Sequence, residues 1–285
     1  MQPAVSGEKT GLPPAEASVV VAGVGLIGGS IAAALRDVSP ATAVIGIGRD
    51  ADRLQAAQER GLITGWALRI TEATIPRGSL GVVCQPVDQI VGTARELLRA
   101  GCGVVTDAGS TKGEICRQLA DERRFVGAHP IAGSEQAGFE HADGSLFSGR
   151  VCVICQGAAD ADAVTRVEQF WRHLGLQIQR LPPVEHDRVL ALTSHLPHVL
   201  AAVAVGVVSD EQLVLTGSGF RDTTRIAAGS AELWSSILLG NAEWCVNAVR
   251  RAETRLREFR VALEQRDEAT LRALWAESAE RRRKL

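Results

Sequence analysis

The sequence predicts an α/β fold, a doubly wound parallel sheet followed by an all-α helical domain. Across residues 18–183, short β-type runs alternate with helical segments of ten to fifteen residues, which is typical of βαβ units. From residue 184 onward, almost every segment has helical periodicity instead. We therefore expect one domain over 18–183, a second over 184–285, and a polar, disordered tail rich in Pro and Gly over 1–17.

Strands of the first domain are expected where Val and Ile cluster in short runs, because β-branched side chains favour an extended chain. The segments between them are rich in Ala, Leu, Arg and Glu and should form the crossover helices. The expected strands are 18–25, 41–48, 80–86, 102–109, 124–130, 150–156 and 177–183. The expected helices are 27–38, 51–61, 87–101, 112–122 and 161–175.

Three helical regions are expected in the second domain. They cover 185–208, with a kink near Pro197, then 230–265 and 267–284. The first of them is apolar nearly all round, so it should be buried on most of its faces. A small helical domain cannot provide that covering by itself, and we expect a second copy of the chain to do so. The sequence therefore predicts a homodimer through this domain.

Composition narrows the class of protein. The 285 residues carry a net charge of −2, which offers no overall attraction to nucleic acid or to an anionic membrane. No apolar run reaches the roughly 20 residues that cross a bilayer, and the N-terminus lacks the apolar core of a signal peptide. We expect a cytoplasmic protein with reduced thiols, Cys152 and Cys155 being buried in a strand. No set of His, Cys and carboxylates has the spacing of metal ligands, so no metal is expected.

A glycine-rich turn follows the first strand. It reads G-x-G-x-x-G, and its position between a strand and a helix in a βαβ array is typical of a dinucleotide site in a Rossmann domain. The first glycine permits a tight turn, the second lets the backbone approach a pyrophosphate, and the third lets helix and strand pack closely. The helix N-terminus then offers free N–H groups to the phosphates. The residues expected to bind the cofactor here are Gly23, Gly25, Leu26, Ile27 and Gly28.

The end of the second strand bears on the choice of cofactor. Gly48 stands where an NAD site usually has an acidic residue, and Arg49 follows it. An arginine there suits the 2′-phosphate of NADP, whereas Asp50 could bind a ribose hydroxyl. We expect NADP or NAD, with NADP slightly favoured. Arg49 could also be a solvated loop charge.

Further candidates follow the later strands. Ligands of doubly wound sheets bind outside the carboxyl ends of the strands. Gln85, Pro86 and Asp107 lie at such ends and are expected to contact the cofactor. Ser110 and His129 also lie at strand ends and should face the nicotinamide.

Five motifs in order carry a resemblance to a known family. They are GVGLIGGS, DAGSTKG, HPIAGSE, SHLPH and GFRDTTRIA, and together they resemble the prephenate dehydrogenase family, which includes arogenate and cyclohexadienyl dehydrogenases. The resemblance extends over 18–275 and implies a Rossmann domain followed by a helical dimerisation domain. It implies oxidation and decarboxylation of prephenate, or of its amino analogue arogenate, with NAD or NADP.

The resemblance also implies roles for individual residues. His129 is expected to accept the proton of the substrate hydroxyl, which suits the pKa range of a neutral imidazole. Ser110 is expected to hydrogen-bond the ring of His129, and Arg225 to bind a substrate carboxylate. Further substrate contacts are expected from His198, His195, Glu135 and Trp234.

Several roles stay open in the sequence. Arg225 could be a structural partner of Asp222, and Arg221 could make the carboxylate contact instead. Lys112 could be a surface charge at a helix start, and Trp234 a core aromatic. An acidic group such as Glu135 near the substrate side chain would favour arogenate. No surrounding set of polar groups singles out the remaining histidines, which are interpreted as surface or packing residues: His141, His173 and His186.

The sequence leaves several alternative functions open. Arogenate, dual-substrate cyclohexadienyl and aminodeoxyprephenate dehydrogenases share these motifs. A β-hydroxyacid dehydrogenase is disfavoured, because the first helix of the second domain offers His195 and His198 and no lysine. A non-catalytic NADP-binding sensor is a remote alternative. The chain leaves no room for a separate regulatory domain or a fused mutase, so we expect no tyrosine feedback through one.

Overall fold

The N-terminal half of the molecule is an eight-stranded sheet with the order β3-β2-β1-β4-β5-β6-β7-β8. A computed structural model describes residues 17–133 and 138–284. All neighbouring strands are parallel except β6 and β7, which pair antiparallel. The doubly wound α/β prediction is therefore confirmed, in a mostly parallel form. The strands are β1 Ser18–Ala22, β2 Ala43–Ile47, β3 Gly65–Ala67, β4 Leu80–Val83, β5 Val104–Asp107, β6 Phe125–Pro130, β7 Val151–Cys155 and β8 Gln177–Arg180.

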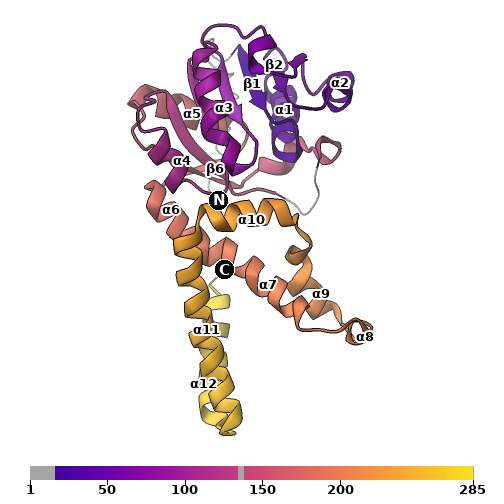
Figure 1. Ribbon diagram of the computed structural model, residues 1–285, viewed down its shortest axis with the longest axis vertical. Coiled ribbons are helices and arrows are strands. Elements are labelled where there is room, and N and C mark those ends of the chain that lie inside the picture. The colour runs from indigo at the N-terminus through magenta and orange to yellow at the C-terminus, as the bar shows by residue number, and fades with distance from the viewer. Residues whose placement is uncertain (1–16, 134–137, 285) are drawn as a thin grey trace, which may run out of the picture.

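Helices cover both faces of this sheet (Figure 1). Successive residues of β1 alternate between two hydrophobic clusters, because side chains of a strand point to opposite faces. One cluster contains the apolar sides of α1 (Leu26–Val38) and α5 (Ala161–His173). The other contains those of α3 (Val87–Arg99) and α4 (Gly113–Gln118). A further helix, α2 (Ala51–Glu59), follows β2.

Two features of the sheet differ from the sequence prediction. β3 is a three-residue edge strand that the sequence did not single out, and β7 runs antiparallel to β6. In its described residues, 131–133 and 138–150, the connection between β6 and β7 contains the 3₁₀ turns Phe139–His141 and Gly144–Phe147 and no full helix. Parallel pairing needs a crossover to the opposite edge. These turns pack on α1 instead, so β7 starts at the edge where β6 ends.

The free thiols of Cys152 and Cys155 are buried in β7, as expected. The predicted tail falls almost wholly outside the described residues. Its last residue, Ala17, is described, and its carbonyl accepts a hydrogen bond from the backbone N–H of Ala43.

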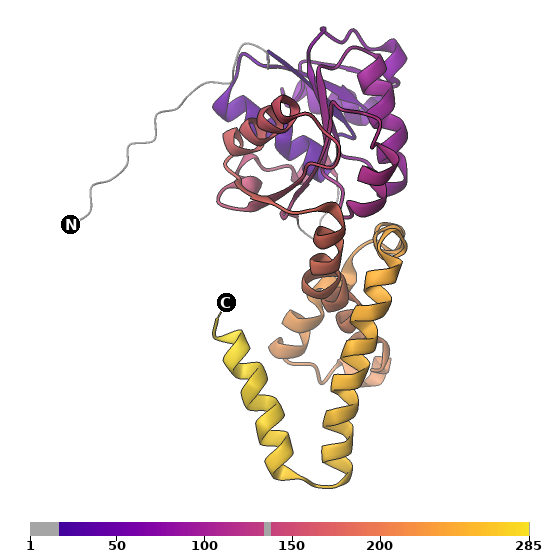
Figure 2. The same cartoon turned by 90° about the vertical axis from the view of Figure 1, so that its left-hand side faces the viewer.

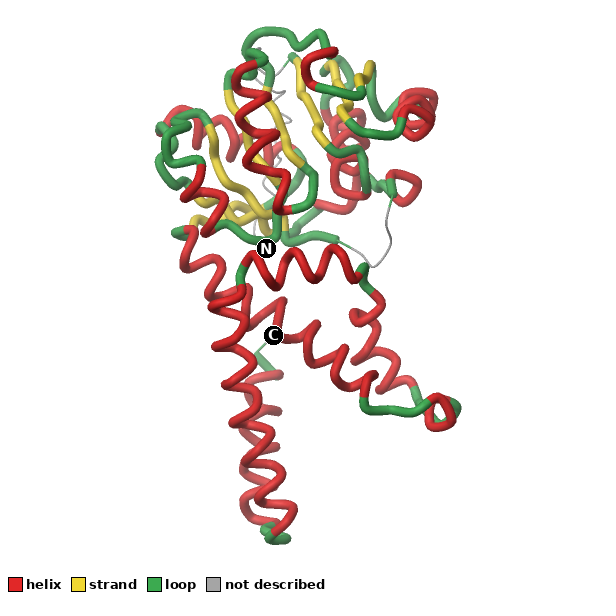
Figure 3. Tube along the Cα trace, in the orientation of Figure 1, coloured by secondary structure: helices red, strands yellow, loops and turns green. Residues whose placement is uncertain are grey.

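The C-terminal half is helical throughout its described residues (Figure 3). α6 passes through a π-turn, Ala191–His195, into α7, so the chain stays helical over Pro183–Gly206. Pro197 comes two residues after this π-turn, and because its nitrogen carries no hydrogen it cannot donate to a carbonyl of the preceding turn. The π-turn is therefore the irregularity expected near Pro197. The helices are α6 Pro183–Leu190, α7 Leu196–Gly206, α8 Asp210–Leu213, α9 Ser218–Thr224, α10 Ala231–Gly240, α11 Ala242–Glu264 and α12 Glu268–Arg282.

The helical region expected over 230–265 is divided in two. Asn241 has φ −131° and ψ 32°, outside helical geometry, and separates α10 from α11. In Figure 1, α10 lies directly below the sheet, whereas α11 runs away from it. α12 folds back beside α11, as Figure 2 shows from the side.

The helical domain buries little of its own apolar surface. Its one hydrophobic cluster contains three buried residues, Ala191, Cys245 and Ala248, within the described part of the chain. Much of α7 is exposed in a single chain, so the burial expected for 185–208 stays a prediction that depends on a second copy. Large side chains exposed on this domain include Val203, Val207, Leu239, Leu256, Leu263 and Trp275.

One helical stretch corrects the expectation that no segment is long and apolar enough to cross a bilayer. Pro183–Gly206 is long and apolar enough to cross a membrane by length and composition. Its first half contains Glu185, Asp187 and Arg188, and the side chain of Asp187 is hydrogen-bonded to the Rossmann domain. These contacts favour a helix that links two domains over one that enters a bilayer.

Candidate active site between the two domains

The glycine-rich turn lies at the point where the strand order reverses, beside the end of β4. Gly23 has φ +99°, and a Cβ on it would come within 2.6 Å of the carbonyl oxygen of Cys84. A Cβ on Gly28 would collide with the carbonyl oxygen of Gly23. Only glycine satisfies both positions, because any side chain would push the helix off the strand.

Gly25 differs from the other two glycines, because a Cβ on it would meet nothing within 4 Å. It is the N-cap of α1, receives no side-chain cap, and no acidic residue occupies the first turn. The N–H groups at the start of α1, at Leu26 and Ile27, therefore have no side-chain cap and adjoin open space. A pyrophosphate fits this arrangement, since a helix N-terminus attracts anions through its N–H groups and its dipole.

The ribose end of the expected cofactor site carries two exposed charges. Arg49 lies two residues after the end of β2, and Asp50 is the N-cap of α2. The carboxylate of Asp50 accepts a hydrogen bond from the N–H of Arg53 at 3.1 Å. Asp50 thus has a structural task as a cap, whereas Arg49 projects from the strand end. This geometry is compatible with a 2′-phosphate near Arg49.

Gln85 and Pro86 follow Cys84 in the short connection between β4 and α3. The Gln85 amide oxygen accepts a hydrogen bond from Thr93 at 2.6 Å, and its Cγ lies 3.1 Å from where a Cβ of Gly23 would be. Pro86 is the N-cap of α3. Both residues therefore lie beside the glycine-rich turn, as a cofactor contact requires.

The side chain of Asp107 is engaged elsewhere than expected. It is fully buried, forms an ion pair with Lys112, and accepts hydrogen bonds from the N–H groups of Gly109 at 2.9 Å and Ala128 at 3.0 Å. Its carboxylate therefore stabilises the loop after β5, and the contact of Asp107 with a cofactor stays a prediction. The surface-charge interpretation of Lys112 is wrong, because this side chain is also fully buried.

His129 lies at the end of β6, half-buried, at the carboxyl edge of the sheet. Its Nδ1 is 2.9 Å from Nε2 of His186, which comes from α6 of the helical domain. The expectation that Ser110 orients this ring is not met among the described residues, where His186 is the hydrogen-bond partner of the ring. Ser110 is half-buried in the loop that follows β5.

His186 and Asp187 are the residues that sequence reasoning missed. His186 is fully buried, and its Nδ1 is 2.7 Å from Oδ1 of Asp187. The packing interpretation of His186 is therefore incomplete, because the ring joins a chain of hydrogen bonds to His129. The available signal was a His-Asp pair in the first turns of the helix that follows Pro182-Pro183. His173, by contrast, hydrogen-bonds Ser39 at a distance from the site.

His195 is the next histidine along the same helical stretch and is 1% exposed. Its Nδ1 is 3.2 Å from the side-chain nitrogen of Asn241 and 3.5 Å from the sulfur of Cys245. Its Nε2 is buried without a hydrogen-bond partner among the described residues. Burial lowers the pKa of His195 to about 4, so the ring is neutral at pH 7. Such an unpaired buried nitrogen is costly unless a ligand satisfies it.

His198, Trp234 and Arg225 form a second group. The Nδ1–H of His198 donates to the carbonyl of Ser194 at 2.9 Å, and the indole of Trp234 stacks on the ring at 3.5 Å between centroids. Trp234 is half-exposed, so the interpretation as a core aromatic does not hold. Arg225 is exposed at the end of α9, and its charge helps burial to lower the pKa of His198.

Electrostatics tie these histidines together. Burial is the main cause that holds the pKa of His129 well below its ordinary value, and the charges of His186, Lys112 and His195 act in the same direction. His186 and His198 in turn help burial to lower the pKa of His195. The result is a group of neutral imidazoles between the two domains, suited to accept a proton. Glu135 lies outside the described residues, as do its neighbours 134–137. Within 17–133 and 138–284, no group of His, Cys, Asp and Glu could hold a metal ion.

A Rossmann domain with an open phosphate turn, followed by a helical domain that brings histidines to the carboxyl edge of the sheet, defines a nicotinamide-dependent oxidoreductase. The family model for the nucleotide-binding domain of prephenate dehydrogenase matches residues 31–180, and the model for its dimerization domain matches residues 182–277. The chain belongs to the prephenate dehydrogenase family.

Characterised relatives support this assignment. The chain is 30% identical over 268 residues to a prephenate dehydrogenase of Bacillus subtilis, covering 89% of this chain and 72% of that protein. It is 28% identical to a cyclohexadienyl dehydrogenase of Zymomonas mobilis, covering 87% of this chain and 89% of that protein.

Solved structures agree. A prephenate dehydrogenase of Aquifex aeolicus in complex with hydroxyphenyl propionate and NAD⁺ is similar with a TM-score of 0.84 and 28% identity, over 93% of this chain and 97% of that one. An arogenate dehydrogenase of Synechocystis is similar with a TM-score of 0.78 and 25% identity, over 94% of this chain and 99% of that one.

Proposed function

We propose that this chain is a prephenate dehydrogenase, which converts prephenate to 4-hydroxyphenylpyruvate with loss of carbon dioxide and serves tyrosine biosynthesis. One observation carries the proposal. His129 is a neutral imidazole at the carboxyl edge of the sheet, and a hydrogen bond to its Nδ1 leaves Nε2 for a substrate. A base in that state and place is what removal of a hydroxyl proton during hydride transfer requires.

The reaction follows from the chemistry of the substrate. A bound nicotinamide supplies the hydride acceptor. Loss of hydride from the carbon that carries the hydroxyl makes that carbon a carbonyl, provided that the hydroxyl proton leaves. Nε2 of His129 accepts this proton. Cleavage of the bond to the ring carboxylate then releases carbon dioxide, and its electron pair completes the aromatic ring, which drives the step.

Substrate binding is assigned to the helical domain. Prephenate carries two carboxylates, and Arg225 offers a guanidinium fork of matching geometry at the end of α9. His198 has its Nδ1–H bound to the backbone, so its Nε2 is free to meet a polar group of the substrate. The unpaired Nε2 of His195 lies one helical turn earlier and provides a second such contact. Trp234 supplies an aromatic face beside them.

A dual-substrate activity is the second candidate. The likeness to a cyclohexadienyl dehydrogenase and to an arogenate dehydrogenase favours it. Arogenate differs from prephenate by an ammonium group on the side chain, and Glu135 is the acidic residue we propose for recognising it. NAD and NADP are both proposed as cofactors, with NADP slightly favoured by Arg49 after β2.

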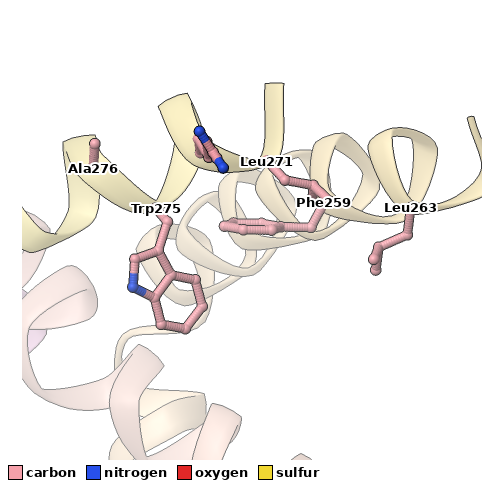
Figure 4. A pocket seen from close by; sticks show the side chains of 6 residues that line it. Phe259, Leu263, Leu271, Trp275 and Ala276 are labelled. Carbon is pink, nitrogen blue, oxygen red and sulfur yellow. The ribbon is translucent and has the colours of Figure 1, made fainter. Parts of the chain in front are cut away.

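The exposed apolar surface of the helical domain supports a homodimer. Figure 4 shows Phe259, Leu263, Leu271 and Trp275 around an open apolar pocket between α11 and α12. Leu263 and Trp275 are 63% and 72% exposed, and a second copy that packs there would bury them. The match to a dimerization domain agrees with this. We propose a cytoplasmic dimer with no membrane or nucleic-acid partner, and sedimentation of the purified chain measures its mass.

Absorbance at 340 nm tests the activity. Purified protein is mixed with prephenate or arogenate and with NAD or NADP in all four pairs, and reduction of the cofactor is followed. A rise with prephenate is expected, and no rise in any pair would overturn the proposal. His129→Asn should lower kcat about 10²- to 10⁴-fold, the usual contribution of a general base, with unchanged NADH affinity. Undiminished turnover in this variant would remove His129 from its role.

A further inference from the structure

Three side chains form a continuous line from the helical domain to the proposed base. Oδ1 of Asp187 is 2.7 Å from Nδ1 of His186, and Nε2 of His186 is 2.9 Å from Nδ1 of His129. The two imidazole rings meet edge to face, with centroids 5.1 Å apart and planes at 61°. His186 is fully buried and Asp187 nearly so, which protects the line from water.

The carboxylate of Asp187 determines which atom donates and which accepts in each of these hydrogen bonds. Oδ1 of Asp187 accepts from the backbone N–H of Lys112 at 2.8 Å, and Oδ2 accepts from that of Gly113 at 2.7 Å. A carboxylate that accepts from two N–H groups is an acceptor for the third partner as well. Nδ1 of His186 therefore carries its proton, and Nε2 of the neutral ring is an acceptor. His129 must then donate through Nδ1–H, which leaves Nε2 as the bare nitrogen.

We propose that His186 and Asp187 are positioning residues that select the tautomer of His129 in which Nε2 is the base. This inference rests on the proposed dehydrogenase function for its catalytic meaning, whereas the tautomer is a property of the protein alone. Unlike a single histidine–carboxylate pair, the line interposes a second imidazole between carboxylate and base.

The line also crosses the boundary between the two domains. His129 belongs to β6 of the Rossmann domain, whereas His186 and Asp187 belong to α6. The same carboxylate caps α4 through the N–H groups of Lys112 and Gly113. The contact of α6 with the Rossmann domain therefore also fixes the tautomer of His129. His129 has a bare Nε2 only while α6 is docked in this way.

The hydrogen bonds from His129 through His186 to Asp187 can also stabilise His129 after it takes up a proton during turnover. When Nε2 of His129 takes the hydroxyl proton of the substrate, the ring becomes an imidazolium with both nitrogens protonated. Its Nδ1–H still donates to His186, and the negative charge of Asp187 stabilises the new positive charge. The charged or titratable groups that face the line from neighbouring elements are Lys112 and Asp107 from the β5–α4 region and His195 from the π-turn. Burial lowers the pKa of His186, which keeps the intervening ring neutral.

The tautomer is measured by ¹⁵N NMR of the histidine rings at pH 7.5, without substrate or cofactor. The His129 signals are assigned by their loss in His129→Asn. We expect protonation at Nδ1 of His129 and at Nδ1 of His186. Protonation of His129 at Nε2 would overturn the proposal, whatever activity the enzyme has.

Variants of His186 test its effect on turnover. His186→Leu removes the acceptor and should lower kcat about 10²-fold, with KM and NADH affinity within a few-fold. His186→Gln places an amide oxygen near the position of Nε2 and should recover much of that loss. His173→Leu, a histidine bonded to Ser39 outside the site, is the matched control and should keep full activity. Equal activities of His186→Leu and the wild type would overturn the proposal, as would equal losses in the Leu and Gln variants.

Asp187→Leu tests the far end of this hydrogen-bond line. Leucine removes the acceptor that holds the proton on Nδ1 of His186, so the tautomers of both imidazoles are no longer fixed. We expect the ¹⁵N signals of His129 to show a mixture of the two tautomers and kcat to fall, with the thermal transition still cooperative. A His129 protonated at Nδ1 alone in a folded variant would overturn the role of Asp187. Absence of wild-type activity would instead defeat the proposed function and leave the NMR result standing.

Discussion

Trp234 lies nearly flat on His198, with ring centroids 3.5 Å apart and planes at 28°. The two residues belong to different helices, α10 and α7. The backbone also approaches the indole closely, since a Cβ on Gly229 would lie 2.5 Å from its Nε1. Close packing around the indole therefore restrains the imidazole that stacks on it.

Replacing the indole tests the contribution of this stack to substrate binding. Trp234→Leu should raise KM for prephenate about 3- to 10-fold with little change in kcat, since an aromatic pair contributes about 0.5–1.5 kcal/mol. Trp234→Phe keeps an aromatic face and should stay within about twofold of the wild type. Steady-state kinetics at saturating cofactor measure both. An unchanged KM in the leucine variant would contradict a role for the stack in binding.

Acidification should destabilise the protein through His195. Its pKa is about 4 in the folded chain and 6.5 for an ordinary histidine, so the unfolded state binds more protons between these values. The contribution of neutral His195 to the free energy of unfolding is therefore fully present above pH 6.5 and is lost as the pH falls toward 4. Urea unfolding at a series of pH values measures the slope. His195→Gln, which cannot titrate, should flatten this dependence, and an identical slope in the variant would contradict the assignment.

The buried ion pair between Lys112 and Asp107 is expected to be costly to break. Lys112→Met leaves an unpaired carboxylate in the interior and should lower the free energy of unfolding by about 3–5 kcal/mol. The double variant Lys112→Met/Asp107→Asn should lose less than Lys112→Met alone, because no charge is then buried unpaired. Arg272→Met, which breaks an exposed pair with Glu268, is the control and should cost under about 1 kcal/mol. Equal losses in the single and double variants would argue against the pair.

Arg49 should report on the choice of cofactor. If it binds the 2′-phosphate, Arg49→Ala raises KM for NADP at least about tenfold, the worth of a hydrogen bond to a charged group, and leaves KM for NAD within about twofold. Arg99→Ala is the control, because Arg99 ends α3 at the opposite edge of the sheet. Kinetics with both cofactors measure the ratio. Equal changes for NAD and NADP would show that Arg49 does not contact the 2′-phosphate.

Features that depend on neighbours in the chain could be predicted from the sequence. Alternating runs of β-branched and helix-forming residues sufficed for the α/β sheet followed by helices. The glycine-rich turn was predictable because its demands are local: Gly23 has a positive φ, and a Cβ on Gly28 would collide with the carbonyl oxygen of Gly23. The position of His129 at a strand end followed in the same way, since a strand delivers its last residues to the carboxyl edge of the sheet.

Tertiary structure decided the partners of these residues. His129 and His186 are 57 positions apart, and only docking of α6 on the Rossmann domain brings their nitrogens within hydrogen-bond distance. Within the described residues the ring of His129 is hydrogen-bonded to His186, a partner that the sequence did not predict. The burial of Lys112 likewise depends on the folded loop around Asp107. Periodicity is a property of one segment, whereas a hydrogen bond between segments depends on how both pack, and the chain order does not contain that geometry explicitly.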